Sequence, residues 1–339
     1  MKLDDRIKAL SALGEEIISK PDWLESYIAT AYNENKWFTP ENSWQALNAI
    51  GDKFLRETIL KQWVSAYGID DAGESKTVGL VLAGNIPLVG FHDVMSTFIS
   101  GHKSLIKCSS KDSILLKAVI ERMVSLFPES KPYFEFSERL KGFDAVIATG
   151  SNNTARYFEQ YFGKYPNIIR KNRNAVAILD GTESKEDFVA LGEDIFKYFG
   201  LGCRNVSKLY VPEAYQFDGL FEVLHEGYKE LANHNKYRNN FDYNNALFLL
   251  NKVEYLMSGS LIITPSKEIA SRIATLHYEH YSDKGELANH LNAMSDQIQC
   301  VVSKSSIAGV DSYKFGEAQQ PSITDYADGV DTLAFLKSL

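Results

Sequence analysis

The sequence predicts an α/β protein built from two domains, and three observations lead to this prediction. From residue 76 onward, short apolar runs alternate with amphipathic segments, in the order strand, helix, strand, helix that parallel sheets require. The length of 339 residues is enough for two domains of ordinary size. Hydrophobic residues make up 45% and charged residues 24% of the chain, as in globular proteins whose core needs no disulfide or metal.

The first 66 residues are predicted to be helical. Apolar side chains repeat there at helical spacing, first at Leu10, Leu13 and Ile17, and the pattern continues through residues 22–33 and 41–63. This stretch carries no motif with recognisable chemistry.

Three strands and three helices are expected between residues 77 and 162. The strands are residues 77–83, 104–108 and 145–149, and the helices are residues 88–100, 113–126 and 152–162. Because helices separate the strands, the strands should be parallel, and a further strand at 176–179 extends the same architecture. Parallel sheets bind ligands at the carboxyl ends of their strands, so the residues that follow these strands are candidates for binding.

A second α/β unit is expected to begin near residue 173. Its predicted helices are residues 185–199, 217–232 and 267–275, and its predicted strands are residues 206–211, 246–250 and 261–264. No linker rich in Pro, Gly or Ser separates the halves, so the boundary between 1–172 and 173–339 rests on a change of motif. The alternative in which the C-terminal tail returns to the first domain stays open.

Charge and hydropathy exclude several classes of function. With 36 basic and 44 acidic residues the net charge is −8, and no long basic run occurs, which argues against a nucleic-acid partner. The most apolar window, residues 78–91, is too short to span a bilayer and contains Asn85 and Pro87, so no membrane span is expected. Asp4 and Asp5 interrupt the N-terminus, which does not resemble a signal peptide, and a cytoplasmic location is expected.

The three cysteines are the candidate nucleophiles. Their odd number and wide spacing fit neither a disulfide framework nor a zinc site, so reduced thiols are expected. Cys108 and Cys300 lie in apolar, strand-like runs, which is typical of small buried side chains. Cys203 follows Gly200 and Gly202 in a loop that can expose its sulfur, and a thiolate attacks a thioester carbonyl readily. The seven histidines show no metal spacing, so no metal is predicted and no histidine is given a role, although one could protonate a leaving thiolate.

Four segments, taken in order, resemble the aldehyde dehydrogenase superfamily, and most closely its fatty acyl-CoA reductase family, which includes the reductase component of bacterial luminescence. They are "AGNIPLVGFHDVMSTFISGHKSLIKCSS" at 83–110, "ATGSNNTARYF" at 148–158, "NAVAILDG" at 174–181 and "FGLGCRNVSKLYVP" at 199–212. A later segment, "YADGVDTLAFL" at 326–336, resembles the end of the same family, whereas residues 1–75 and 213–310 match weakly. The resemblance implies a Rossmann-type nucleotide-binding domain in residues 1–172 and a second α/β catalytic domain in residues 173–339.

The resemblance implies two catalytic residues. The cysteine of "GLGC", Cys203, corresponds to the nucleophile of the superfamily. The asparagine of "GNIP", Asn85, corresponds to the side chain that stabilises the oxyanion together with the backbone amide of the nucleophile. Without the resemblance, an Asn so close before a Pro is more often a turn former. Leu201 stands where the superfamily usually has glutamine, a departure that removes no catalytic group.

The resemblance also implies a nicotinamide cofactor, although no G-x-G-x-x-G follows the first strand. Gly150 and Ser151 lie where a strand ends and a helix begins, so the free amides of that helix could face a pyrophosphate; a plain N-cap is the alternative. Lys107 corresponds to the lysine that holds the adenosine ribose. Ser110 replaces a glutamate of NAD-preferring members, and Lys111 adds a positive charge, so NADPH is expected to be preferred, with NADH possible.

The segment at 168–173 departs from members that hydrolyse the acyl-enzyme. Those members have a glutamate there to activate water, whereas this chain reads Ile-Ile-Arg-Lys-Asn-Arg. A thioester on Cys203 should therefore persist until coenzyme A or hydride resolves it. The basic residues could meet coenzyme A phosphates or form a solvated charge run, and both alternatives stay open.

Taken together, these features predict an oxidoreductase that converts a long-chain fatty acyl-CoA to a fatty aldehyde with NADPH through a cysteine thioester. An acyl-protein is a further possible donor, and an acyl-protein synthetase a possible partner. Two alternatives remain: an acyl-phosphate reductase of the same superfamily, and a cofactor-binding or assembly subunit that does not turn over.

Overall fold

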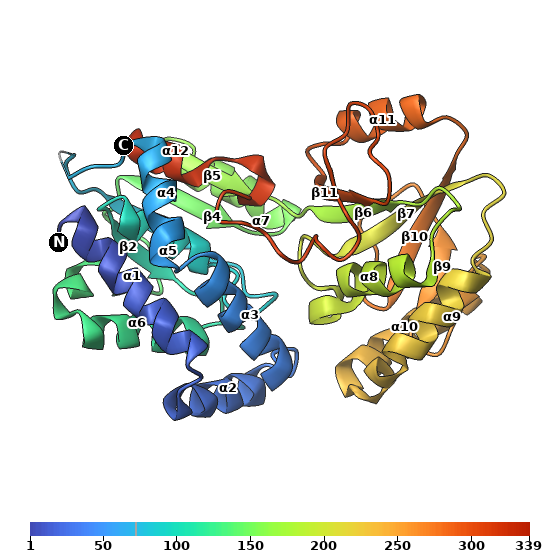
Figure 1. Ribbon diagram of the computed structural model, residues 1–339, viewed down its shortest axis with the longest axis horizontal. Coiled ribbons are helices and arrows are strands. Elements are labelled where there is room, and N and C mark those ends of the chain that lie inside the picture. The colour runs from blue at the N-terminus through green and yellow to red at the C-terminus, as the bar shows by residue number, and fades with distance from the viewer. Residues whose placement is uncertain (72) are drawn as a thin grey trace. The chain divides into compact units, whose positions relative to one another are not determined.

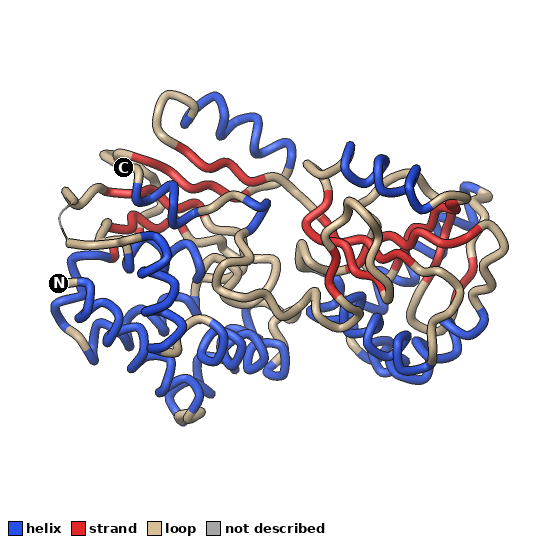
Figure 2. Tube along the Cα trace, turned by 45° about the horizontal axis from the view of Figure 1, so that its top comes forward, coloured by secondary structure: helices blue, strands red, loops and turns tan. Residues whose placement is uncertain are grey.

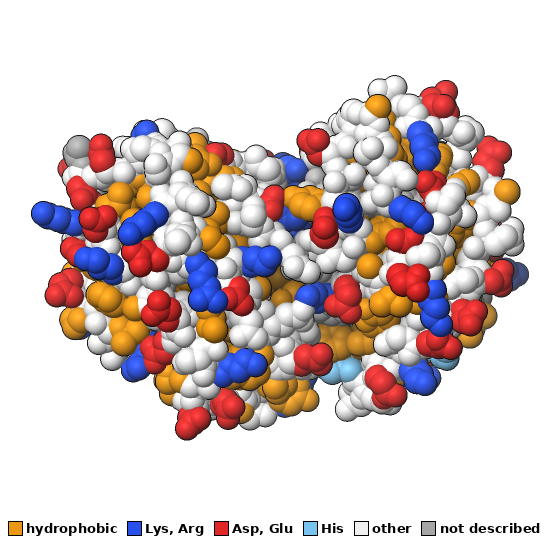
Figure 3. Space-filling view, in the orientation of Figure 1, with side chains coloured by type: hydrophobic (Ala, Val, Ile, Leu, Met, Phe, Trp, Pro, Cys, Tyr) orange, Lys and Arg blue, Asp and Glu red, His pale blue; other side chains and the backbone are white. Residues whose placement is uncertain are grey.

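The computed structural model describes residues 1–71 and 73–339, and the chain divides into two compact units. Unit 1 comprises Met1–Asn172 and Pro321–Leu339, and unit 2 comprises Arg173–Gln320. Each unit is built on a largely parallel sheet with helices, which confirms the predicted α/β class (Figure 1). Among the described residues, no helix has both the length and the apolarity to cross a bilayer. On the face drawn in Figure 3, acidic and basic side chains are interspersed.

Four helices begin unit 1, as the sequence predicts. They are α1 (Leu3–Ile18), α2 (Asp22–Glu34), α3 (Pro40–Lys53) and α4 (Glu57–Tyr67). The apolar stripe of α1, with Leu13 and Ile17 fully buried, faces the core of unit 1. Helix α3 begins where Thr39 Oγ1 accepts a hydrogen bond from the amide of Asn42, with Pro40 in the first turn.

The sheet of unit 1 has five parallel strands in the order β3-β2-β1-β4-β5. The strands are β1 (Thr77–Val81), β2 (Lys103–Lys107), β3 (Phe134–Phe136), β4 (Ala145–Thr149) and β5 (Asn167–Arg170). The elements between them are α5 (Phe91–Ile99), α6 (Ile114–Leu126), the 3₁₀ turn η1 (Pro128–Tyr133) and α7 (Asn152–Phe162). Strand order reverses at β1, which makes its carboxyl end the switch point of a doubly wound sheet.

The last residues of the chain complete unit 1 with η4 (Ala327–Gly329) and α12 (Thr332–Lys337). His92 Nε2 lies 2.9 Å from the carbonyl oxygen of Ile323, and His102 Nε2 lies 2.9 Å from that of Leu336. Burial lowers the pKa of both histidines, so these side chains bind the tail as neutral imidazoles. Leu336 is itself fully buried in the core of unit 1.

Arg170 itself fits neither of the alternatives given for the basic segment at 168–173. It ends β5 and is buried, with Nη1 2.6 Å from a carboxylate oxygen of Asp93 on α5 and Nη2 2.8 Å from Thr332 Oγ1. The charge is therefore neither solvated nor available to coenzyme A, because it joins the sheet to α5 and to the C-terminal tail. Lys171, by contrast, pairs with Glu159 at the surface.

The sheet of unit 2 has seven strands in the order β12-β11-β6-β7-β10-β9-β8, and only β8 is antiparallel. The strands are β6 (Asn174–Ile178), β7 (Val206–Pro212), β8 (Leu256–Met257), β9 (Ile262–Pro265), β10 (Thr275–Tyr281), β11 (Ile298–Ser303) and β12 (Ser312–Tyr313). The helices are α8 (Lys185–Phe196), η2 (Lys197–Gly200), α9 (Asp218–Tyr228), η3 (Lys229–Asn233), α10 (Asn235–Asn251) and α11 (Lys284–Ala293). Helix α11 covers one face of this sheet, and α8, α9 and α10 cover the other (Figures 1 and 2).

Two elements predicted in unit 2 are wrong. Residues 246–250, predicted as a strand, form the end of α10, where Leu249 and Leu250 are exposed. Residues 267–275, predicted as a helix, are irregular up to Thr275, which begins β10. The second segment has helical spacing, but it buries Ile269 and turns through Ala274 at φ 61° before the strand.

Candidate active site

Four of the predicted site residues lie at the carboxyl edge of the sheet in unit 1. Val81, at the end of the central strand β1, pairs with Lys107 on one side and with Ala148 on the other. Asn85 follows β1, Lys107 ends β2, and Gly150 and Ser151 follow β4. The structure thus brings together groups from three neighbouring strands at the edge where parallel sheets bind ligands.

The start of α7 fits a pyrophosphate. Ser151 Oγ accepts a hydrogen bond from the amide of Thr154 at 3.3 Å, which fixes the N-terminus of an 11-residue helix. At Gly150 an added Cβ would lie 2.9 Å from the ring of Phe158, so only glycine fits there without a shift. Backbone amides and the positive end of the helix dipole therefore stand at the surface beside a backbone that a ligand can approach.

The loop after β2 carries the other cofactor candidates. The side chains of Lys107, Ser110 and Lys111 are all exposed, and Ser109 Oγ accepts the amide of Lys111 at 3.2 Å. Because Ser110 is uncharged, this loop presents two ammonium groups to solvent at the carboxyl edge.

Sequence reasoning missed Asp112 in the same loop. Its carboxylate is buried, and Oδ2 accepts the amide of Leu88 at 2.7 Å. Burial raises the pKa of Asp112 to about 7. An acidic residue just before an amphipathic helix is typical of helix starts, and this pattern does not indicate a bond to another loop.

Cys203 lies in the loop that precedes β7. Its loop is therefore at the amino edge of the sheet in unit 2, whereas the residues above lie at a carboxyl edge. The chain reaches it through three consecutive residues with positive φ, namely Tyr198 at 52°, Phe199 at 59° and Gly200 at 75°. Left-handed conformations at two bulky residues are strained, and such strain is held where the surroundings fix it. The ring of Phe199 is held by His234, with the ring centroids 4.3 Å apart.

Asn205, two residues after the cysteine, fixes this loop and was also missed. Its side chain is buried, and Oδ1 accepts the amide of Gly202 at 2.8 Å. Its Nδ2 donates to carbonyl oxygens at the end of α8 and in η2, those of Asp194, Ile195 and Lys197, at 3.1, 3.3 and 2.9 Å. One side chain therefore binds both the loop that carries Cys203 and the end of the helix before it. No sequence rule distinguishes such an Asn from a turn former.

Arg204 carries a positive charge that interacts with both Cys300 and Cys203. Its guanidinium lies over the ring of Tyr313, 5.5 Å from the centroid. Burial alone lowers the guanidinium pKa, but the side chains of Cys300, Tyr313 and Cys203 raise it above its ordinary value. The same guanidinium is therefore in electrostatic reach of Cys300 and of Cys203.

Cys108 has surroundings that suit a thiol rather than a thiolate, whereas Cys300 lies within electrostatic reach of Arg204, as Cys203 does. Burial raises the pKa of Cys108 to about 11, and Cys300 is buried in β11. A thiol with a raised pKa is a poor nucleophile at neutral pH.

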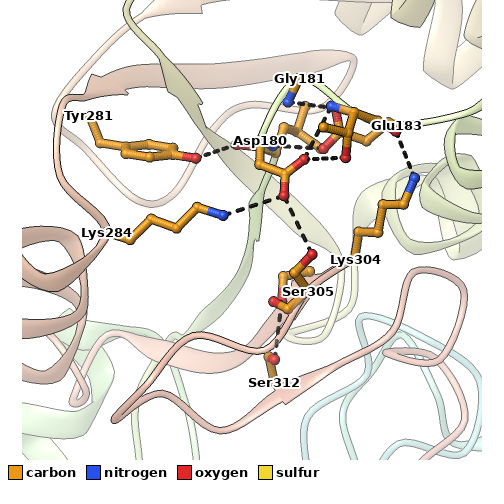
Figure 4. Close-up of polar contacts among 11 residues, drawn as sticks. Asp180, Gly181, Glu183, Tyr281, Lys284, Lys304, Ser305 and Ser312 are labelled. Atoms are coloured by element: carbon orange, nitrogen blue, oxygen red, sulfur yellow. Dashed lines mark hydrogen bonds and ion pairs between the residues drawn. The ribbon is translucent and has the colours of Figure 1, made fainter.

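The carboxyl edge of the sheet in unit 2 is occupied by a network of charges (Figure 4). Asp180 Oδ2 lies 3.3 Å from Lys284 Nζ and 3.4 Å from Ser305 Oγ, and hydrogen bonds from Thr182 hold the pKa of Asp180 below its ordinary value. The carboxylate of Glu183 accepts hydrogen bonds from the backbone amides of Asp180 and Gly181. Lys304 Nζ donates a hydrogen bond to the carbonyl oxygen of Thr182 and forms an ion pair with Asp187. These groups bind one another at the carboxyl edge. Among residues 1–71 and 73–339, no group of three or more His, Cys, Asp and Glu is arranged to hold a metal ion.

Solved aldehyde dehydrogenases share this fold. An NAD-dependent benzaldehyde dehydrogenase from Corynebacterium glutamicum superposes with a TM-score of 0.68 and 13% identity, over 91% of this chain and 80% of that one. Aldehyde dehydrogenase 21 from Physcomitrella patens, solved with succinate, gives 0.67 and 14%, over 90% and 74%. Betaine aldehyde dehydrogenase from Staphylococcus aureus, solved with NAD⁺, gives 0.64 and 13%, over 94% and 72%.

The chain is also similar in sequence to a curated acyl reductase. The chain is 26% identical over 204 residues to long-chain acyl-protein thioester reductase 2 of Photobacterium leiognathi. That match covers 55% of this chain and 42% of the relative, so the chain spans less than half of the relative's length. No family model matches the sequence. Over most of its length the chain therefore has the fold of solved aldehyde dehydrogenases, and over 204 residues its sequence is similar to that of an acyl-protein thioester reductase.

Proposed function

We propose that this protein reduces an acyl thioester, either an acyl-CoA or an acyl-protein, to a fatty aldehyde with NADPH. The observation that carries the proposal is the placement of the predicted residues: Asn85, Lys107 and Ser151 lie at one sheet edge, and Cys203 lies in a loop fixed by Asn205. The acyl-protein donor is favoured by the relative from Photobacterium leiognathi, whose name gives that substrate.

In this proposal the carboxyl edge of unit 1 holds the cofactor. Gly150 and Ser151 bind the pyrophosphate through the start of α7, and Lys107 binds the adenosine ribose. Ser110 leaves room for a 2′-phosphate that Lys111 attracts, which gives a preference for NADPH over NADH. When bound, NADPH supplies the hydride that reduces the acyl group.

Cys203 carries the acyl group. Its sulfur forms a bond to the acyl carbonyl carbon, and the bond from that carbon to the donor sulfur breaks, so that the donor leaves as a thiolate and takes up a proton. After the two-electron reduction, the thiohemiacetal on Cys203 loses its hydroxyl proton, the carbon–sulfur bond breaks, and the aldehyde and the Cys203 thiolate separate. Arg204 is in electrostatic reach of Cys203 at the start and at the end of this cycle.

Asn85 stabilises the negative charge on the carbonyl oxygen in both tetrahedral stages. Its side-chain amide donates to that oxygen together with the backbone amide of Cys203. Since the segment 168–173 contains no carboxylate to activate water, the acyl-enzyme favours reduction over hydrolysis.

The test is the intact mass of the protein after mixing with a long-chain acyl-CoA, an acyl-protein or an acyl phosphate, with no reductant present. We expect one acyl adduct from a thioester donor, mapped to Cys203, and its release as aldehyde when NADPH is added. Cys203→Ser should abolish the thioester adduct, and Cys108→Ser, at a thiol whose pKa burial raises to about 11, should leave it unchanged. An adduct from acyl phosphate alone would support the acyl-phosphate reductase alternative. NADPH binding without an adduct from any donor would support a non-catalytic subunit.

A further inference from the structure

The turn that carries Asn85 has a backbone conformation that needs external support. Residues 82–90 connect β1 to α5, and within them Leu88 has φ 58°. A left-handed backbone conformation is strained for any residue other than glycine. Leu88 is also buried in the core of unit 1, so its side chain and its backbone are both constrained.

Asp112 supplies that support from a different loop. It lies just before α6, and its Oδ2 accepts a hydrogen bond from the amide of Leu88 at 2.7 Å, which is short for such a bond. Among the described residues, Oδ1 of Asp112 has no hydrogen-bond partner, although it is buried. Burying a carboxyl group costs free energy that an apolar side chain would not, so core packing does not explain its presence.

A second contact lies on the other side of Asn85. At Gly84 an added Cβ would lie 2.6 Å from Ser109 Cβ and 3.1 Å from the amide nitrogen of Asp112, so the two loops touch closely there. Asn85 therefore stands between two points, Gly84 and Leu88, at which the loop of residues 109–112 holds its turn.

We infer that Asp112 is a positioning residue for Asn85, which it orients through the amide of Leu88; this inference rests on the proposed function of Asn85 as the oxyanion donor. A displaced oxyanion donor costs rate in the chemical step, because its hydrogen bond is realised in the transition state. Removing the support should therefore lower kcat and leave cofactor affinity and KM nearly unchanged.

Two substitutions of Asp112 and one control separate positioning from stability. Asp112→Ala removes the acceptor, whereas Asp112→Asn keeps an acceptor oxygen in the same shape. Asp144→Ala is the matched control, because Asp144 Oδ2 also accepts a backbone amide, that of Thr77 at 2.8 Å, at the opposite edge of the same sheet. We expect Asp112→Ala to lower kcat about tenfold to a hundredfold. Asp112→Asn and Asp144→Ala should stay within about threefold of the original, and NADPH affinity should change by less than about threefold in all variants.

A double-variant cycle gives the sharper readout. When Asn85 is already alanine, adding Asp112→Ala should lower kcat by less than about a further twofold, because both substitutions remove the same interaction with the transition state. Additive losses would overturn the inference, as would an Asp112→Asn variant that is as slow as Asp112→Ala, or a loss confined to cofactor affinity.

Amide hydrogen exchange tests the same contact without any activity. We expect faster exchange across residues 82–91 in Asp112→Ala and unchanged exchange there in Asp112→Asn. If exchange rises as expected but Asn85→Ala leaves kcat unchanged, the proposed role of Asn85 fails and the structural contact stands. If exchange in this segment does not respond to Asp112→Ala, the inference itself fails.

Discussion

The two units place their candidate groups at opposite edges of similar sheets. In unit 1, Asn85, Lys107 and Ser151 follow parallel strands and meet at the carboxyl edge. In unit 2, Cys203 precedes β7 and lies at the amino edge, while the carboxyl edge is filled by the network around Asp180.

The two candidate sites are therefore found from different kinds of structural information. Strand order alone identifies the edge used in unit 1, because doubly wound sheets bind ligands where the strands end. In unit 2 the candidate nucleophile, Cys203, precedes a strand instead, and its loop depends on a strained turn and on the bonds of Asn205. The following variants act on one unit and leave the other as an internal reference.

The largest effect is expected in unit 1 from Arg170→Met. Breaking the buried pair with Asp93 leaves an uncompensated carboxylate, which should lower the free energy of unfolding of unit 1 by about 3 to 5 kcal/mol. Urea unfolding followed by hydrogen exchange in each unit measures it. Lys171→Met is the control, because its pair with Glu159 is half exposed and should change stability by less than about 1 kcal/mol. Equal losses in the two variants would contradict the role given to Arg170.

The next effect is expected in unit 2 from Asn205→Ala. Freeing the loop should slow acylation of Cys203 about a hundredfold, since a small displacement of a reacting group has effects of that size. Stopped-flow acylation measures the rate, and NADPH affinity, which belongs to unit 1, should change by less than about twofold. Asn244→Ala removes another buried Asn of unit 2, bonded to the carbonyl oxygen of Ile273, and should leave acylation nearly unchanged. Slow acylation in both variants would mean that general destabilisation is the cause.

A smaller effect is expected from Ser110→Glu at the carboxyl edge of unit 1. A carboxylate there repels a 2′-phosphate and can bind ribose hydroxyls, so the ratio of kcat/KM for NADH to that for NADPH should rise about tenfold. Ser110→Gln has the same size without the charge and should change this ratio by less than about threefold. An unchanged ratio in Ser110→Glu would place the adenosine ribose away from this loop.

The last effect, spread over several pH units, is a pH dependence of stability that both units share. Burial raises the pKa of Asp112 in unit 1 and of Asp194 in unit 2 to about 7, above the ordinary value of 3.8. Between about pH 4 and 7 the unfolded chain ionises these groups before the native state does, so stability falls as pH rises, by at most about 1.4 kcal/mol per pH unit for each group.

Asp194→Asn tests that slope in unit 2. Asp194 accepts the amides of Gly316 and Ala318, so the substitution has a cost of its own at every pH. Its stability relative to the original protein should nevertheless improve steadily from pH 4 to pH 7 and level off above that range. A difference that stays constant with pH would mean that the pKa of Asp194 is not raised.

Prediction from sequence succeeded where a local pattern and the tertiary structure agree. Strand β4 and helix α7 have the bounds that their apolar run and the Ser151 cap predict. It failed at residues 246–250, because an apolar run at the end of a long polar helix looks like a strand until its exposure is known. Asp112 and Asn205 could not be found in the sequence, since their importance comes from bonds to Leu88 and to α8 rather than from neighbours along the chain.

The return of residues 321–339 to unit 1 has a consequence for the order of folding. Unit 2 is an insertion, so the ribosome finishes it before it makes the segment with which His92, His102 and Arg170 bond. Unit 2 can therefore mature during translation, whereas the core of unit 1 stays open beside α5 until the final helix arrives.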